Sequence, residues 1–157
     1  MRSAPLQAFS LLELVIVIAI LGAASIAAPP IYQWMRYQGV GHAADQLRCD
    51  LHLARLMAIN RKKTCSLEFD VPAKGQYRNS LSRQVTDLRM YRGGVHFLRE
   101  GPDQNAMSPR ISFNSRGMAV PAGDVYLSDE EQTRICRILV LMPGSISIFS
   151  WSGGQWQ

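Results

Sequence analysis

The sequence has little of the material from which most catalytic and metal sites are built. Its 157 residues include three histidines, and these stand apart at His42, His52 and His96. There is no Ser-His-Asp set and no glycine-rich phosphate loop, and the few carboxylates form no evident pair. Ser115-Arg116-Gly117 marks a turn rather than a nucleophile elbow. We therefore expect a protein that is not an enzyme and that uses no metal, cofactor or small-molecule substrate.

Cysteine is also scarce. There are three, Cys49, Cys65 and Cys136, and their spacing fits no zinc motif. An odd number leaves at least one thiol unpaired within the chain. In an oxidising compartment Cys65 and Cys136 can form a disulfide if their strands are neighbours, whereas Cys49, on a predicted helix, can instead meet Cys65. Buried free thiols are the remaining alternative, so the pairing stays open.

Long apolar segments are absent except for one. Residues 9–28 carry no charge other than Glu13, and these 20 residues are long enough to span a bilayer core of about 30 Å as a helix. There is no second such segment, no internal repeat and no low-complexity region. A carboxylate inside a membrane helix costs on the order of a few kcal/mol and usually marks function. We expect Glu13 to pair with a positive group.

Processing of the chain can create that positive group. Residues 1–8 are polar and include one arginine, which favours a cytoplasmic start. A cut between Ala8 and Phe9 places a new α-amine four residues before Glu13, and the amine of an adjacent subunit is the alternative partner. A secretory signal or a plain signal anchor also has a basic start and an apolar centre. The carboxylate in the apolar centre, and Pro29 directly after the small residues, argue against a signal peptide.

Residues 8–13 read Ala-Phe-Ser-Leu-Leu-Glu and lead into the apolar run. This motif resembles the N-terminus of the type IV prepilin and type II secretion pseudopilin superfamily, with Ala8 where the family normally has Gly. The resemblance implies cleavage after Ala8 by prepilin peptidase and N-methylation of Phe9. It also implies that Glu13 acts in methylation and assembly, and that the helix packs into a filament core.

Residues 29–63 have the pattern of an amphipathic helix. Pro29 and Pro30 lack a backbone donor, so we expect a helix kink or a short break there. The cations at 61–63 are favoured at the end of this helix by its dipole. A narrow apolar stripe, suited to lying on a sheet, follows helical spacing at Ala43, Ala44, Leu47, Leu51, Ala54 and Ala58.

Residues 64–157 change from helical to alternating patterning. We predict an α+β fold in which a long N-terminal helix, transmembrane in its first half and amphipathic in its second, packs on a compact antiparallel, pilin-like β domain. Seven or eight short strands are expected, and the most apolar, 134–142, should be central. The candidate segments are 65–69, 76–81, 85–91, 95–99, 110–114, 118–120, 125–128, 134–142 and 145–151.

Two segments, Leu53–Arg61 and Ile111–Gly117, resemble FimT/GspH-type minor pilins and pseudopilins. The resemblance implies a helix on two small sheets and a minor subunit near a filament tip. Some FimT-like pilins bind DNA through a Gly-Arg-x-Arg motif, but residues 143–147 lack both arginines, which removes much of the attraction for phosphate. Arg134 and Arg137 nearby keep a DNA contact as an alternative.

Together these patterns predict a minor pseudopilin, a structural subunit of a type II secretion pseudopilus involved in protein export across the outer membrane. The alternatives are a FimT-like type IV pilus minor pilin in pilus biogenesis or DNA uptake, and a generic anchored periplasmic domain. We expect a cleaved leader (1–8), a filament-core helix (9–28), an amphipathic helix (29–63) and a periplasmic β domain (64–157). The expected partners are other pilins or pseudopilins, prepilin peptidase and the bacterial inner membrane. We expect the chain to cross this membrane once, with a cytoplasmic N-terminus and a periplasmic C-terminal domain, before it is extracted into a filament.

Overall fold

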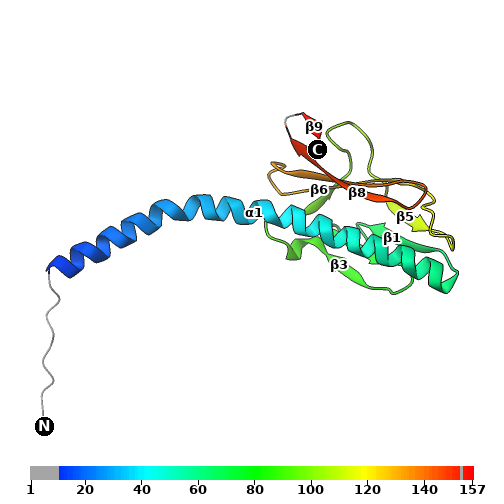
Figure 1. Cartoon of the computed structure of the whole chain (residues 1–157), viewed down its shortest axis with the longest axis horizontal. Coiled ribbons are helices and arrows are strands. Elements are labelled where there is room, and N and C mark those ends of the chain that lie inside the picture. The colour runs from blue at the N-terminus through cyan, green and yellow to red at the C-terminus, as the bar shows by residue number, and fades with distance from the viewer. Residues whose placement is uncertain (1–10, 153) are drawn as a thin grey trace, which may run out of the picture. The chain divides into compact units, whose positions relative to one another are not determined.

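The computed structural model describes the backbone of residues 11–152 and 154–157, and their side chains apart from those of residues 24 and 26–37 (Figure 1). The chain divides into two units, Met1–Trp34 and Met35–Gln157. The predicted leader and the cleavage site at Ala8 and Phe9 lie outside the described residues. The first unit is therefore represented by the beginning of one helix, and the second by the rest of that helix and the β-strands.

The helix, α1 (Leu11–Arg61), is continuous over 51 residues. It passes through Pro29 and Pro30, so the expected short break is wrong, and the helix kink stays a prediction. Two adjacent prolines remove two backbone donors, and the hydrogen bonds of the flanking turns are enough to continue the helix. Part of the expected transmembrane segment 9–28 lies outside the residues whose side chains are described; among those residues, no helix is both long and apolar enough to cross a membrane.

The second unit contains two antiparallel sheets. Their strand orders are β3-β2-β1-β5 and β4-β6-β7-β8-β9, and a short 3-10 helix, η1 (Leu88–Met90), follows β3. Between residues 65 and 157, leaving out residue 153, there are nine strands rather than seven or eight. Their bounds are β1 (Cys65–Phe69), β2 (Gln76–Asn79), β3 (Val85–Asp87), β4 (His96–Leu98), β5 (Arg110–Phe113), β6 (Gly123–Ser128), β7 (Ile135–Val140), β8 (Ile146–Ser152) and β9 (Gln155–Trp156).

Most strands lie where the alternating pattern predicts them. β7 occupies the middle of the five-stranded sheet, with Ile138 opposite Val125 on β6 and Ile148 on β8, so the prediction of a central strand is confirmed. Segment 118–120 forms one isolated bridge, between Ala119 and Phe113, instead of a strand. The added strand is β9, which pairs with the end of β8.

The apolar stripe of α1 is buried against the sheets, as predicted. Its six positions and Val40 are at most 1 % exposed, and they join one core cluster with residues of both sheets. Four of the six predicted positions are alanines, so the backbone of the helix lies close to the strands. Figure 1 shows this half of α1 running alongside β1 and β8 within the second unit. The stripe positions are Ala43, Ala44, Leu47, Leu51, Ala54 and Ala58.

Candidate functional site

The first turns of α1 carry an apolar surface that nothing within the described residues covers. Nine large aliphatic side chains between Leu11 and Leu21 are each 45–80 % exposed. They point to all sides of the helix rather than to one face, because almost every residue in this stretch is apolar. A helix that is apolar all round is stable only inside a protein core, a bundle of helices or a membrane. This surface is therefore the candidate assembly site.

Glu13 is the single charge on this surface. It lies exposed in the first turn of α1, where the helix dipole favours a negative side chain. Within the described part of the chain its carboxylate has no hydrogen-bond or ion-pair partner. The α-amine that a cut before Phe9 would create lies outside that part, so the pairing of Glu13 stays a prediction. Pro29 and Pro30 lie in the helical backbone, and their side chains are not among those described.

The cysteines do not pair in the structure. Cys49 is exposed on α1, whereas Cys65 and Cys136 are buried with free thiols. The strands of Cys65 and Cys136, β1 and β7, belong to different sheets, so the condition for a disulfide between paired neighbouring strands is not met. The Cys65 thiol instead donates a hydrogen bond to Asn79 Oδ1 over 3.3 Å. Burial raises the pKa of both buried thiols.

Arg137 is occupied by carboxylates of its own domain. Its Nε and Nη2 donate to the two oxygens of Asp124 over 2.9 and 3.1 Å, and its Nη1 donates to Asp103 over 3.3 Å. The guanidinium also lies 6.0 and 5.7 Å from the ring centroids of Tyr126 and Trp156. These hydrogen bonds with Asp124 raise the pKa of Arg137. The geometry gives Arg137 a structural role, and its predicted contact with DNA stays a prediction.

Arg134 is exposed directly before β7, and its backbone N–H donates to Asp129 Oδ1 over 3.1 Å. It stands three positions before Arg137, and side chains at an odd separation along an extended chain point to opposite faces. The two arginines therefore do not form a joint cationic site. A contact of Arg134 with DNA remains an untested prediction.

Arg55 forms a connection that the sequence did not reveal. From α1 its Nε donates to the carbonyl of Gly117 over 2.9 Å, and its Nη2 donates to the carbonyl of Pro143 over 3.3 Å. Gly117 and Gly144 both have positive φ, and a Cβ on Gly144 would lie 2.2 Å from the Gly117 carbonyl oxygen. The helix and the turns after β5 and β7 are thus held together, including the segment where FimT-like pilins carry their arginines.

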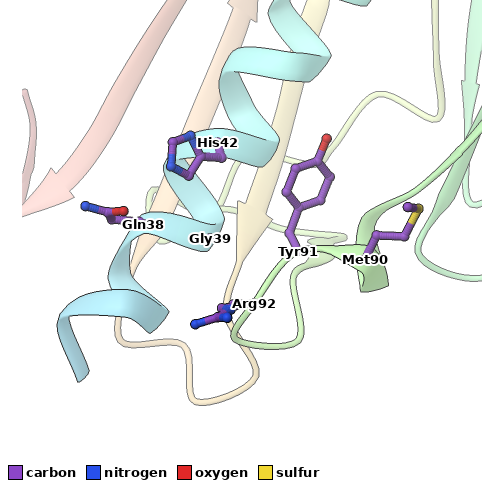
Figure 2. A pocket seen from close by; sticks show the side chains of 6 residues that line it. All are labelled: Gln38, Gly39, His42, Met90, Tyr91 and Arg92. Carbon is purple, nitrogen blue, oxygen red and sulfur yellow. The ribbon is translucent and has the colours of Figure 1, made fainter. Parts of the chain in front are cut away.

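A hollow of about 400 Å³ lies between α1 and the segment after η1. Figure 2 shows the residues that line it: Gln38, Gly39 and His42 on the helix, and Met90, Tyr91 and Arg92 across from them. Burial and the charge of Asp50 raise the pKa of Tyr91. The six described lining residues include no carboxylate and no thiol. In the described residues no group of histidine, cysteine and acidic side chains is placed to hold a metal ion.

Comparison with known proteins places these features in a context. The family model for type II transport protein GspH matches residues 43–144. No curated protein has a significantly similar sequence.

The similar solved structures include two crystal forms of the type IV minor pilin FimU of Pseudomonas aeruginosa strain PAO1. The P21 form has 14 % identity and a TM-score of 0.54, and the match covers 79 % of this chain and 96 % of FimU. The P65 form has 13 % identity and a TM-score of 0.49, and the match covers 74 % of this chain and 96 % of FimU. At this identity, the P21 match shows a common fold.

Proposed function

The chain belongs to the type II transport protein GspH family, and from this premise we propose that it is a minor pseudopilin, a structural subunit of a type II secretion pseudopilus that takes part in protein export across the outer membrane. The observation that carries the proposal is the uncovered apolar surface from Leu11 to Leu21 with Glu13 in its first turn. A subunit that inserts this surface among the helices of its neighbours removes it from water. The second unit, Met35–Gln157, which we call the β unit, then stays outside the helix bundle, available to other partners.

In this proposal prepilin peptidase cuts after Ala8, Phe9 is N-methylated, and residues 9–28 hold the precursor in the inner membrane. The N-terminus is cytoplasmic and the β unit is periplasmic until the subunit enters the filament. Six members of the proposed span, residues 9, 10, 24 and 26–28, have no described side chain, and all except Ser10 are apolar in sequence. Proximity to an α-amine offsets the cost of placing the Glu13 carboxylate among aliphatic side chains.

Replacing Glu13 tests the proposal. In a bacterial host that also produces prepilin peptidase and the other filament subunits, Glu13→Ala should stop incorporation into sheared, sedimented filaments, because the carboxylate can no longer pair with an amine. Glu130→Ala removes an exposed carboxylate from the β unit instead and should enter filaments normally. Mass spectrometry of the mature chain should show that residues 1–8 are missing.

Two results would contradict the proposal. Incorporation of Glu13→Ala at the wild-type level would remove the pairing of Glu13 from the mechanism. An uncut chain beginning at Met1 would favour a generic anchored domain. Unchanged urea unfolding of the β unit in Glu13→Ala confirms that a loss of incorporation is not a loss of folding.

A second candidate is a minor pilin of a type IV pilus, in pilus biogenesis or DNA uptake. The fold shared with the type IV minor pilin FimU supports it. The two systems differ in their phenotype. Deletion of the gene from its own bacterium should reduce release of secreted enzymes if the proposal is right, whereas loss of surface pili with normal secretion would favour the type IV pilus.

A further inference from the structure

One end of the β unit, where α1 finishes, carries positive charge alone. Four segments meet there: 59–64, 80–84, 114–118 and 141–145. Together they hold no aspartate or glutamate. Their five cations, which we call the cationic end, are Arg61, Lys62, Lys63, Arg83 and Arg116.

Contacts between the segments establish that they lie together. A Cβ on Gly117 would lie 2.8 Å from Ile59 Cδ1, which joins the end of α1 to the turn after β5. The carbonyl of Gly117 in turn lies beside Gly144, in the turn after β7. The turn after β2 is joined through Ser80, whose backbone N–H donates to the carbonyl of Ser66 over 2.9 Å, two residues beyond the first segment. Figure 1 shows the end of α1 and β5 at the same end of the unit.

The cations of this end have no acidic partner. All five side chains are exposed, and within the described residues none forms an ion pair or a side-chain hydrogen bond. The dipole of α1 accounts for Arg61, Lys62 and Lys63, which stand at its C-terminal end. It does not account for Arg83 and Arg116, which come from two other turns. Some cations elsewhere in the unit are paired, such as Arg78 with Glu68 over 2.7 Å.

Exposed aliphatic side chains adjoin the cations. Ile59, Met118, Leu141 and Met142 are 39, 36, 47 and 65 % exposed. The carbonyl of Met142 accepts a hydrogen bond from the backbone N–H of Ala119 over 3.0 Å. Ala119 directly follows Met118, so the two methionines lie on neighbouring stretches of backbone. The four segments contain no aromatic residue, so the bases of a nucleic acid would find no ring on which to stack.

We propose that the cationic end and its aliphatic neighbours bind an acidic, amphipathic segment of another protein. Glutamates or aspartates on such a segment meet the five cations, while its apolar side chains cover Met118 and Met142. Flexible methionines suit a partner helix whose apolar face must fit an irregular surface. The charges select the partner and speed its encounter, and the apolar contacts hold it. This surface uses no residue of 9–28, so the inference is independent of the role proposed for Glu13.

Binding of a designed peptide to the full-length chain in detergent micelles tests the inference. The probe is a labelled 18-residue helical peptide with glutamates on one face and leucines on the other, followed by fluorescence anisotropy at 50 and 150 mM salt. The triple variant Lys62→Glu, Lys63→Glu, Arg116→Glu should bind at least about tenfold more weakly, because three attractive contacts become repulsive. The control Arg48→Glu, Lys74→Glu, Arg99→Glu changes the net charge equally at exposed sites elsewhere and should bind within about threefold of wild type.

The aliphatic contribution is tested separately. Met142→Ser should weaken peptide binding by about threefold or more, since it removes part of a thioether side chain that the bound peptide covers. Met90→Ser is the control: this side chain is 83 % exposed and lies outside the four segments, so the change should have no effect on peptide binding. A milder triple with glutamine at positions 62, 63 and 116 guards against misfolding and should fall between wild type and the glutamate triple.

Three results would overturn the inference. Equal losses in the two triple variants would mean that only net charge matters. Binding of a 20-base-pair DNA duplex more tightly than the peptide, with Met142→Ser unchanged for both, would identify a nucleic-acid surface instead. Failure of the wild-type chain to bind the peptide at 50 mM salt would show that the end has no such partner chemistry.

Discussion

Arg55 allows a quantitative test of how the helix is held on the β unit. The change Arg55→Met keeps most of the aliphatic stem and removes the guanidinium. The bond to the Gly117 carbonyl, at 2.9 Å and partly buried, should contribute about 1.5 kcal/mol as a charge-assisted hydrogen bond. The bond to Pro143, at 3.3 Å and exposed to water, should contribute about 0.5 kcal/mol. The free energy of unfolding is therefore expected to fall by about 2 kcal/mol.

Urea unfolding of the full-length chain in detergent, followed by tryptophan fluorescence, measures this change. With a slope of about 2 kcal/mol per molar urea, the midpoint should move down by about 1 M. Arg48→Met is the matched control, because Arg48 is exposed on the same helix and makes no side-chain hydrogen bond or ion pair within the described residues. It should change the free energy of unfolding by less than about 0.5 kcal/mol.

The comparison of the two variants decides the outcome. If Arg55→Met and Arg48→Met unfold at the same urea concentration, the two carbonyl contacts do not stabilise the unit. If Arg55→Met alters the slope rather than the midpoint, the variant has changed the cooperativity of unfolding, and the estimate from two lost hydrogen bonds no longer applies.

Two further predictions concern groups that are buried in the β unit. With a water-soluble thiol reagent, the native chain should react at Cys49 alone, because Cys65 and Cys136 are buried and burial raises the pKa of their thiols. The denatured chain should react at all three thiols. A single reactive thiol in the denatured chain would reveal a disulfide. Burial and the nearby Asp124 charge raise the pKa of Tyr126 to about 12, from about 10 in the unfolded chain. The native state therefore favours the protonated phenol, whose stabilisation is complete below about pH 10 and is lost as the pH rises towards 12. Tyr126→Phe should make that alkaline fall in the free energy of unfolding shallower, and an unchanged fall would contradict the assignment.

The periodic parts of the fold could be predicted from the sequence. Apolar residues at helical spacing define the buried face of α1, because a helix that lies on a sheet hides one stripe. Alternation located eight of the nine strands found in the described residues. The strand that escaped, β9, has two residues, which is too short for any period to show. Segment 118–120 resembles a returning strand, yet it contributes one bridge because the chain turns again at Pro121.

Contacts between distant residues could not be predicted in this way. Arg55 meets carbonyls 62 and 88 residues further along the chain, and backbone acceptors leave no mark in a sequence. Arg137 looked like a free cation because its partners, Asp103 and Asp124, are recognisable only once β6 and β7 are paired. Gly39 is a further example, because a glycine inside a helix signals by its sequence only a local weakening. In the structure a Cβ there would lie 1.8 Å from the Arg92 carbonyl oxygen, so a side chain at this position would push the helix away from the loop.

Unlike the contacts of Arg55 and Arg137, the candidate assembly site could be predicted, because its residues are neighbours in the sequence. Glu13 and the aliphatic residues around it are contiguous in sequence, so their chemistry can be recognised without any tertiary contact. The cationic end arises from four separate segments and becomes visible only when the turns are placed beside the end of α1.

The narrow alanine-rich stripe also determines how the β unit resists mechanical force. A pull along the axis of α1 slides the whole row from Val40 to Ala58 past the strands, so all of these short-range contacts share the load at once. A pull at right angles, applied at one end, separates the same row one helical turn at a time. The direction of pulling, more than the number of contacts, then sets the force at which the helix leaves the sheets.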